Sequence, residues 1–496
     1  MSLGSILRSS QDFTDRLCIV DKKSNLVKFG SVKTVEQRKL IDMLDSHKRV
    51  AIVKARQLGA TTAVRSHCFH EVYTSPKPVR SACISNKSRS AEALLRMDRT
   101  FYKNLPGKLK RPMSDDKAMG YSYSSTGAGA LAFSAKSDSQ DRGYTFSSIH
   151  MSEFAFFDHA AEVLASWEAT ADEGRIIIES TPNHYGDELH NIALDSMYND
   201  SWKVIMMPWF TFPSYRKELP KGGFEMDAAE IALMQDCSLT PEQIFWRRCK
   251  IETMKSESLF RHEYPITIEE AYSLSEANFF TEEEVGQVEI IECKPSYKQI
   301  LSPINKESAY CIGVDTAGGV GKDYSVAMAV EKGSNIPTVC ISSNSVPIRK
   351  FAEDVIRLSE ELNGCLVFFE ENNHGHALKE IFNSLGFNNY QAFQTTMRSK
   401  ISLYDMLRSY IHEDLLPMLD RATFTEMRNL VRSEKGLAPE HPPNGHDDRV
   451  IALMLALRGL RDVSRPKRFI DPRIRDLQRA KRPSQQLTNP LFNNRR

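Results

Sequence analysis

The chain has 496 residues, 41% of them apolar and 26% charged, which indicates a globular protein of about two to four domains. Its 65 Lys and Arg residues are balanced by 64 Asp and Glu residues, so any nucleic-acid surface must be a local patch. The nine cysteines form no C-x-x-C pair, and neither a signal-like start nor an apolar run of about 18 residues occurs. These features argue against a zinc module, a disulfide scaffold, a secretory leader and a membrane span.

The stretch 50–62, V-A-I-V-K-A-R-Q-L-G-A-T-T, predicts a strand, a tight turn and a helix over 62–73. A phosphate-binding loop needs this order, because the N–H groups at a helix N-terminus face the anion. In the motif G-x-x-x-x-G-K-[ST], Gly59 and Thr61 fit, but Ala60 stands in place of the lysine. Lys54 stands in place of the first glycine. Either this is an ordinary strand–turn–helix, or its cation comes from another residue.

The elements around this stretch predict an α/β sheet. A helix over 34–44 begins at Thr34, and Gln37 in its first turn is either solvated or an adenine contact. A strand follows at 80–85, and antiparallel strands are predicted within 121–135. Strands that alternate with helices and end in polar residues favour a parallel sheet with its ligands at the carboxyl ends of the strands.

Two later strands end in polar residues. The mainly apolar strand within 146–157 ends at Glu153, which in a nucleotide hydrolase orients the attacking water. The usual Asp-Glu pair is Ser152-Glu153 here, and a serine holds Mg²⁺ only weakly. The strand within 175–183 ends in a polar turn.

Five motifs occur in order at suitable spacings: K-A-R-Q-L-G-A-T-T, S-N-K-S-R-S-A-E-A-L, D-R-G-Y, M-S-E-F-A-F and I-I-E-S-T-P-N. Together they resemble the packaging ATPase of tailed-bacteriophage terminase large subunits. The resemblance implies an N-terminal RecA/ASCE-type P-loop ATPase with a parallel sheet. In this family the loop lysine can stand at the start of the loop, which is Lys54 here. Whether Lys54 or Arg56 replaces the lysine missing at Ala60 is left open.

The resemblance also implies the site residues. The expected nucleotide contacts are Gln37, Lys54, Arg56, Gln57, Gly59, Ala60, Thr61 and Thr62. Thr61 also becomes a ligand of Mg²⁺, Glu153 the catalytic carboxylate and Arg142 a finger-type arginine. Ser180-Thr181-Pro182 becomes the segment that couples hydrolysis to movement. Ser152 departs from the family's aspartate at the Mg²⁺ site.

The middle of the chain predicts a connector. Residues 213–224 are rich in Pro, Gly and Lys and predict a linker or an exposed loop. A helix begins at Thr240-Pro241, with the threonine as N-cap and the proline at the first helical position. The segment 260–272 resembles the family's junction between ATPase and nuclease. We expect it to be a packed connector without chemistry of its own.

Carboxylates gather in the second half. A hairpin is predicted over 310–330, with a first strand that ends at Asp315. A buried strand at 365–369 ends at Glu370-Glu371, and an apolar helix starts at Asp447-Asp448. Each acid alone is typical of a cap or a turn. Three acids at two strand ends and a helix start instead predict a ribonuclease-H-like α/β nuclease, whose two divalent metals lie about 3.5–4 Å apart. Mg²⁺ and Mn²⁺ both prefer such oxygen ligands.

The motifs V-D-T-A-G-G-V-G-K-D-Y, E-E-N-N-H-G and H-D-D are similar to those of the terminase nuclease. By this similarity the metal ligands are Asp315, Glu370, one or both of Asp447 and Asp448, and Asp323 as an auxiliary. Glu371 is the alternative to Glu370, and the family spacing E-x-N favours Glu370. The nearby histidines are either proton shuttles or hydrogen-bonded neighbours.

The predicted domains are an ATPase over 1–212, a connector over 213–300, a nuclease over 301–461 and a basic disordered tail over 462–496.

The resemblance implies ATP-driven movement of viral double-stranded DNA into a procapsid and metal-dependent cutting of concatemers. ATP and Mg²⁺ are the expected cofactors, with Mn²⁺ an alternative in the nuclease. The expected partners are double-stranded DNA, the portal protein of the procapsid, the small terminase subunit and further copies in a pentameric ring, with no membrane. The expected location is the host cytoplasm, with transient docking on the procapsid and no place in the mature virion.

Two other functions compete with this one. An ATP-dependent helicase–nuclease of repair or defence would need a second RecA-like lobe, for which residues 310–460 carry no nucleotide motif. A non-enzymatic scaffold would fit Ala60 and Ser152, but Glu153 and the full set of acids argue against it.

Overall fold

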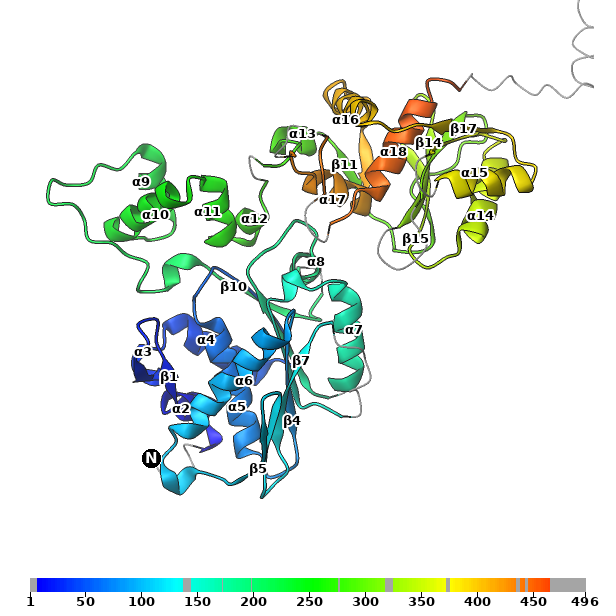
Figure 1. Cartoon of the computed structure of the whole chain (residues 1–496). Helices are drawn as coiled ribbons and strands as arrows, with labels where there is room; N and C mark the ends of the chain where they lie inside the picture. Colours follow the sequence, from blue (N-terminus) through cyan, green and yellow to red (C-terminus); the bar gives the residue numbers. More distant parts are fainter. Residues whose placement is uncertain are drawn as a thin grey trace, which may run out of the picture. The chain divides into compact units, whose positions relative to one another are not determined.

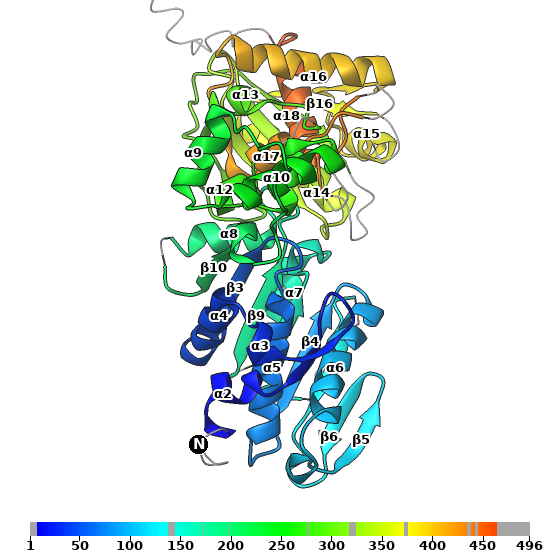
Figure 2. The same cartoon turned by 90° about the vertical axis from the view of Figure 1, so that its left-hand side faces the viewer.

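The computed structural model describes residues 7–136, 144–171, 173–197, 199–274, 277–316, 324–371, 375–433, 438–441 and 445–463. The chain divides into two compact units, Met1–Asn278 and Phe279–Arg496. Each unit contains a sheet flanked by helices (Figure 1 and Figure 2). No helix within these ranges is long and apolar enough to cross a membrane. The predicted tail lies outside the described residues from 464 onward.

The first unit is built on an eight-stranded sheet of order β10-β3-β9-β8-β4-β7-β6-β5. The six strands from β10 to β7 are parallel, and β6 and β5 extend this sheet in antiparallel fashion. The bounds are β10 (Lys203–Met207), β3 (Arg49–Lys54), β9 (Arg175–Ser180), β8 (Ser148–Ser152), β4 (Arg80–Ser85), β7 (Gly129–Ser134), β6 (Gly120–Tyr123) and β5 (Met113–Lys117). The predicted parallel sheet and the antiparallel pair within 121–135 are confirmed.

Helices cover both faces of this sheet (Figure 1). One face carries α4 (Val35–Ser46), α5 (Ala60–Thr74) and α6 (Ser88–Lys103), and the other carries α7 (Ala160–Ala171) and α8 (Glu188–Asp195). Strand β3 contributes side chains to the cores on both faces of the sheet. Val50 and Ile52 pack with α4 and α5, whereas Ala51 and Val53 pack with α7 and α8. The smaller elements before α4 are α2 (Ser10–Asp15), β1 (Cys18–Val20), β2 (Leu26–Lys28) and α3 (Phe29–Val32).

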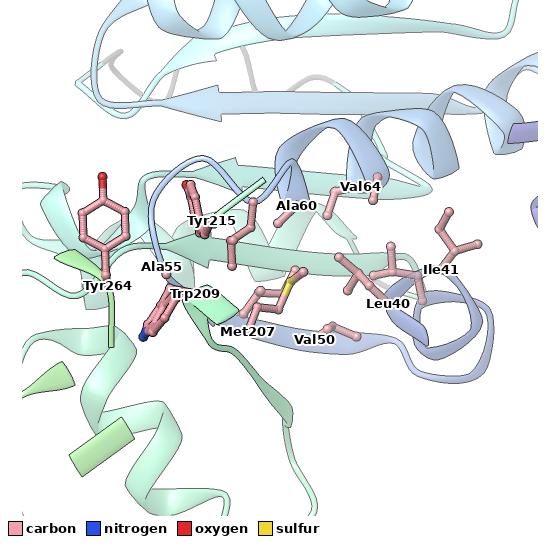
Figure 3. Packing of buried hydrophobic residues seen from close by; sticks show 14 of the residues in the cluster. Leu40, Ile41, Val50, Ala55, Ala60, Val64, Met207, Trp209, Tyr215 and Tyr264 are labelled. Atoms are coloured by element: carbon pink, nitrogen blue, oxygen red, sulfur yellow. The ribbon is translucent and has the colours of Figure 1, made fainter. Parts of the chain in front are cut away.

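A group of helices follows β10 in the same unit: α9 (Ala228–Asp236), α10 (Pro241–Met254), α11 (Glu257–Glu263) and α12 (Ile268–Ala271). The predicted loop 213–224 contains no helix or strand. Three aromatic residues from this part of the chain, Trp209, Tyr215 and Tyr264, belong to the core cluster that also holds Val50 and Ala60 (Figure 3). The chain beyond residue 212 therefore completes the core beneath β3 and α5.

The second unit has a six-stranded sheet of order β12-β15-β14-β13-β16-β17. Strands β12, β15, β14 and β13 are antiparallel neighbours, whereas β13, β16 and β17 are parallel. The bounds are β12 (Lys298–Ile300), β15 (Pro337–Ser343), β14 (Ser325–Glu331), β13 (Tyr310–Asp315), β16 (Leu366–Glu370) and β17 (Tyr390–Phe393). The predicted hairpin is confirmed, since β13 ends at Asp315 and β14 begins at Ser325.

Helices α14 (Ile348–Glu361) and α15 (Gly375–Ser384) pack on one face of this sheet. Helix α18 (Asp448–Gly459) lies directly on β13, where a Cβ atom at Gly313 would come within 1.9 Å of the Ala452 carbonyl oxygen. Glycine at position 313 is therefore what brings the helix so close to the strand. The remaining elements are α13 (Glu282–Gly286), α16 (Met397–His412), α17 (Arg421–Asn429) and the parallel pair β11 (Glu289–Ile291) and β18 (Met418–Asp420).

Two candidate active sites

The loop between β3 and α5 has the backbone of an anion-binding loop. Gly59 caps α5 with a φ of +70°, a conformation that favours glycine. A Cβ atom at this position would lie 2.4 Å from Gln37 Nε2, so a larger residue would displace the Gln37 side chain in addition to straining the backbone. Helix α5 then runs for 15 residues, and its first N–H groups and its dipole favour negative charge at the loop.

Gln37 braces this loop from α4. Its side-chain amide donates to the carbonyl oxygens of Leu58 at 3.1 Å and Gly59 at 3.2 Å. Its side-chain oxygen accepts the backbone N–H of Thr34 at 2.9 Å, as part of the capping box that starts the helix. Gln37 therefore fixes the position of the glycine, and the adenine contact implied by the resemblance stays a prediction.

The two cations that could replace the missing lysine lie in different surroundings. Ala60 is buried in the apolar cluster beneath α5 and brings no charge (Figure 3). The side chain of Lys54 is only 12% exposed, and its ammonium lies 2.6 Å from a carboxylate oxygen of Glu179. The side chain of Arg56 is 56% exposed and pairs with Glu263 of α11. Lys54 thus lies among the strand ends, while Arg56 lies at their rim.

Glu179 is the centre of this cluster, and sequence reasoning did not single it out. It is fully buried on β9, and its Oε1 accepts hydrogen bonds from the hydroxyls of Thr61 at 2.8 Å and Ser152 at 2.7 Å. The only signal in the sequence was a charged residue within the apolar run R-I-I-I-E-S. A carboxylate in a buried strand needs partners, and this rule could have identified the residue.

The charges at Glu179 are balanced within the cluster. Burial acts to raise the pKa of Glu179, but the ammonium of Lys54 and the imidazole of His150 outweigh it and hold this pKa below its usual range. His150 Nε2 lies 3.4 Å from Glu179 Oε1, and burial lowers the pKa of the histidine. The result is a buried carboxylate that is stable as an anion because a cation stands beside it.

Glu153 follows directly after β8, at the carboxyl edge of the sheet. Its side chain is exposed, and its backbone adopts a φ of +60°, which is costly for a residue with a side chain. Gln57 in the loop is also left-handed, at a φ of +53°, and is exposed, while Thr62 is half-buried in the first turn of α5. Ser180 ends β9, where its buried hydroxyl lacks a hydrogen-bond partner among the described residues. Arg142 lies outside the described residues.

The connector contacts the phosphate loop directly. The backbone N–H of Arg56 donates to the Glu263 carbonyl oxygen at 3.0 Å, and the Tyr215 hydroxyl donates to the Arg56 carbonyl oxygen at 2.6 Å. Tyr272 also donates to Asp187, the residue that caps α8 just after the predicted coupling segment, at 3.3 Å. The segment 260–272 therefore holds the loops of the site in addition to filling space.

The second cluster of acids lies at the edge of the other sheet. Asp315 ends β13 and Glu370 ends β16, and these parallel neighbours pair in register just before both acids. Asp448 is the first residue of α18, which packs on β13, and Asp447 precedes it as the N-cap. Burial, together with the charges of Asp448, Glu370 and Asp447, raises the pKa of Asp315 well above its usual value. The chain therefore brings the four predicted acids into one electrostatic neighbourhood.

The surroundings distinguish Glu370 from Glu371. Glu371 forms an ion pair with Lys379 on α15, and this pair lowers the pKa of Glu371. Glu370 is among the largest charge effects that raise the pKa of Asp315. The preference for Glu370 therefore has support from charge as well as from spacing.

Asp447 and Asp448 also differ. Asp447 lies 3.6 Å from the ammonium of Lys400 and accepts the hydroxyl of Tyr404 at 3.3 Å. Both partners come from one face of α16, four residues apart, and neither was predicted. Asp448 instead accepts the backbone N–H of Tyr324 at 3.3 Å and lies 3.5 Å from His446 Nδ1.

Glu426 on α17 is a further acid that the sequence did not indicate. Its carboxylate accepts the backbone N–H groups of Arg449 at 2.7 Å and Val450 at 3.2 Å, and so caps the start of α18. Burial raises the pKa of Glu426 well above its usual value, and the charge of Asp448 adds to this effect. The helix that presents Asp448 is thus held at its first turn by another carboxylate.

This cluster has the donor chemistry for a divalent cation, because carboxylate oxygens are the ligands that Mg²⁺ and Mn²⁺ prefer. An acidic neighbourhood in which a carboxyl pKa is raised lacks enough positive charge of its own. Across the described ranges, no three His, Cys, Asp or Glu side chains converge closely enough to hold an ion as they stand. Asp323 lies outside these ranges, and the full ligand set stays a prediction.

These features define a class of protein: an α/β chain with a phosphate-loop sheet and a separate acid-centred sheet. No protein-family model matches the chain, and no curated protein matches it by sequence. Among solved structures, the chain is similar to the HK97 bacteriophage large terminase, at 12% identity over 92% of this chain and 99% of that one, with a TM-score of 0.51.

Two further structures match with lower scores. The large terminase nuclease of the thermophilic phage G20c with bound magnesium is 19% identical over 37% of this chain and 98% of that one, with a TM-score of 0.34. The large terminase of a second thermophilic bacteriophage, in complex with ADP, is 11% identical over 85% and 98%, with a TM-score of 0.34. The HK97 match shows that this chain has the large-terminase fold. The predicted fold, an α/β unit with a mainly parallel sheet followed by a second α/β unit with a mixed sheet, is confirmed.

Proposed function

We propose that the chain is the large subunit of a phage terminase, which uses ATP to move double-stranded DNA into a procapsid and cuts concatemers with a metal-dependent nuclease. The observation that carries this proposal is the presence of two unlike centres on one chain with the large-terminase fold. One centre is a phosphate loop beside a carboxylate whose charge is balanced by a lysine. The other is a group of acids with too little positive charge around it. A motor that also cuts needs both kinds of centre.

In the ATPase, the loop N–H groups and the Lys54 ammonium bind the phosphates, and the Thr61 hydroxyl faces the metal. Glu153 accepts a hydrogen bond from the attacking water and orients it toward the terminal phosphate. Bound Mg²⁺ supplies the charge that neutralises the phosphate oxygens. Arg142, by the family resemblance, adds positive charge in the transition state from its own subunit or a neighbouring one.

In the nuclease, Asp315, Glu370 and Asp448 hold divalent metal at the edge of the sheet. Divalent metal held there would supply the positive charge needed to lower the pKa of a water and to offset the charge on the leaving oxygen of the phosphodiester. Lys400 and Tyr404 hold Asp447 in place at the side of this group. Glu426 fixes the first turn of α18 and thereby the position of Asp448.

The proposed partners are double-stranded DNA, the portal protein, the small terminase subunit and further copies of the chain in a pentameric ring. The proposed location is the host cytoplasm, with transient docking on the procapsid. The family resemblance of the sequence motifs is what supports these assignments.

The ATPase is tested with Glu153→Ala in the full chain. DNA-stimulated ATP turnover should fall by about a hundredfold or more, because the group that orients the water is lost. Cutting of plasmid DNA with Mn²⁺ should be unchanged, which serves as the control for folding. Undiminished ATP turnover would show that the ATPase assignment is wrong. Lys54→Ala and Arg56→Ala measured side by side identify the phosphate cation, and unchanged turnover in Lys54→Ala rules that lysine out.

The nuclease is tested with Asp315→Ala. Plasmid cutting with Mn²⁺ should disappear while ATP turnover remains, and persistent cutting contradicts the assignment. Displacement of a third strand from a triplex reports movement along a duplex, whereas separation of a labelled duplex reports helicase activity. The proposal expects the first activity without the second. Strand separation would instead favour an ATP-dependent helicase–nuclease.

A further inference from the structure

We propose that Glu179 supplies the carboxylate that is missing at Ser152, the position where the usual Asp-Glu pair has its aspartate. In this role it positions the hydroxyls of Thr61 and Ser152 and the ammonium of Lys54 for a nucleotide and its divalent metal. The inference rests on the proposed ATPase function and deepens it. The inference adds Glu179 to that site, a residue for which neither the sequence motifs nor the fold implied a role.

The register of the sheet places Glu179 beside the gap. Ser152 on β8 and Glu179 on β9 are direct partners in a parallel ladder, so both side chains point to the same face of the sheet. Ser152 stands where an aspartate is expected. A glutamate on the adjacent strand is one methylene longer, which allows its carboxylate to reach the place beside that position.

The contacts of Glu179 are those of an organising group. Its Oε1 accepts the hydroxyl of Thr61 at 2.8 Å and that of Ser152 at 2.7 Å. Its Oε2 lies 2.6 Å from the ammonium of Lys54. Thr61 lies in the first turn of the helix after the loop, Lys54 ends the strand before it, and Ser152 directly precedes Glu153. One buried carboxylate therefore touches all three sides of the proposed nucleotide site.

These bonds give the hydroxyls a direction. A hydroxyl that donates its proton to a carboxylate turns its oxygen lone pairs away from that carboxylate, which leaves them available to a metal. The same carboxylate keeps the lysine among the strand ends, where its ammonium is ready for phosphate oxygens. Groups that orient metal-facing oxygens in this way commonly change metal affinity by about 10–100-fold when removed. Glu179 is thus a positioning residue.

Another buried carboxylate of the same unit provides a matched comparison. Asp98 on α6 is fully buried and pairs with Arg65 at 2.6 Å, and Tyr121 donates to it at 3.0 Å. This pair joins α5 to α6 and contacts no residue of the loop. Asp98→Asn therefore removes a buried charge without removing a contact to the site.

The test compares Glu179→Gln and Asp98→Asn in the full chain. The Mg²⁺ concentration for half-maximal ATP turnover is measured, together with the gain in affinity for a fluorescent ADP when Mg²⁺ is added. Glu179→Gln should raise the Mg²⁺ requirement about tenfold or more and remove most of that gain. Asp98→Asn should leave both quantities at the wild-type value. An unchanged Mg²⁺ requirement in Glu179→Gln overturns the inference.

The decisive variant moves the carboxylate back. In Ser152→Asp/Glu179→Gln the acid stands at the usual position, and the Mg²⁺ requirement should return to within about threefold of the wild type. A double variant that folds but needs as much Mg²⁺ as Glu179→Gln overturns the inference. If Glu179→Gln alone does not fold, the double variant carries the test, because it retains a carboxylate for Lys54. Its requirement is then compared with that of Ser152→Asn/Glu179→Gln, and equal requirements overturn the inference.

The wild-type chain separates this inference from the proposed function. If it neither binds fluorescent ADP nor turns over ATP with DNA present, the ATPase proposal fails. If it does both and Glu179→Gln behaves like Asp98→Asn, only the role of Glu179 fails.

Discussion

Glu179 and Asp315 are both carboxylates at the carboxyl end of a central strand, and their surroundings act on them in opposite directions. Glu179 has the Lys54 ammonium 2.6 Å away, and its pKa is lowered. Asp315 has Asp448, Glu370 and Asp447 as its charged neighbours, and its pKa is raised. The first centre has a cation in contact with its carboxylate, whereas at the second the charge of Lys400 is outweighed by burial and by the three other acids.

This difference indicates how each centre meets its ligand. When an anionic nucleotide binds the loop, its phosphate can replace Glu179 as the partner of Lys54, so the first centre is ready for phosphate. The acids of the second centre repel each other until positive charge arrives, so this centre is ready for a cation. The same change, from acid to amide, should therefore have opposite effects on the two units.

The largest expected effect is a loss of stability in Glu179→Gln. Breaking a buried ion pair by removing one partner costs about 3–5 kcal/mol, because the other charge is left without compensation. All four tryptophans lie between residues 167 and 246, within the first unit. Unfolding in urea followed by tryptophan fluorescence therefore measures this unit alone. A free energy of unfolding equal to that of the wild type would contradict the pairing.

A smaller effect of opposite sign is expected for Asp315→Asn, which should raise the melting temperature of the second unit without metal at pH 7. The folded-state pKa of Asp315 lies above its unfolded value of 3.8, so ionisation destabilises the fold as the pH rises. The gain in Asp315→Asn should thus be absent below pH 3.8 and grow with pH toward the raised pKa. Calorimetry at several pH values measures this gain. The transition of the second unit is the one that tryptophan fluorescence does not report. A gain that shrinks between pH 4 and pH 7 would contradict the sign.

A modest effect is expected for Lys400→Ala, which removes the cation 3.6 Å from Asp447. The acids then hold more net negative charge, so Mn²⁺ should bind about two- to fivefold more tightly at low salt. A Mn²⁺ titration followed by electron paramagnetic resonance measures this. Lys379→Ala, which removes a lysine paired with Glu371, is the matched control and should leave the affinity unchanged. Weaker Mn²⁺ binding in Lys400→Ala would mean that the lysine supports the metal site.

The smallest expected effect is that of Glu371→Gln. Its carboxylate is already paired with Lys379, so Mn²⁺ affinity and plasmid cutting should stay at the wild-type level. Glu370→Gln should lower the affinity about tenfold or more, because a ligand oxygen loses its charge. The reverse result would make Glu371 the ligand.

Much of the architecture was predictable because local patterns determine it. Apolar runs with polar ends located β3, β8, β13 and β16, and the acids that terminate two of them were predicted from their position alone. Gly59 was predictable because a tight turn before a helix demands a left-handed residue. Helix α9 was missed, although Asp227 and Glu230 have the spacing of a capping box and form one at its start.

The residues that sequence reasoning missed depend on which segments become neighbours. Glu179 matters because β9 lies beside β8 in a particular register, and one sequence does not specify that pairing. Lys400 matters because α16 turns one face toward Asp447, and its spacing to Tyr404 is common to any amphipathic helix. In each case the type of residue was visible, while its partner lay in a distant segment.

The contacts of Arg56 have a consequence for the order in which the chain becomes competent during its synthesis. Within the described ranges, the backbone N–H and carbonyl of this loop residue have their partners in Glu263 and Tyr215, which leave the ribosome long after the loop itself. A nascent chain that ends near residue 212 would hold the parallel sheet but not the groups that fix the loop. Because domains fold as units when their last contacts become available, nucleotide affinity should arise late, when α11 has been made. The loop is thus fixed by residues that come later in the chain, which delays activity until the first unit is complete.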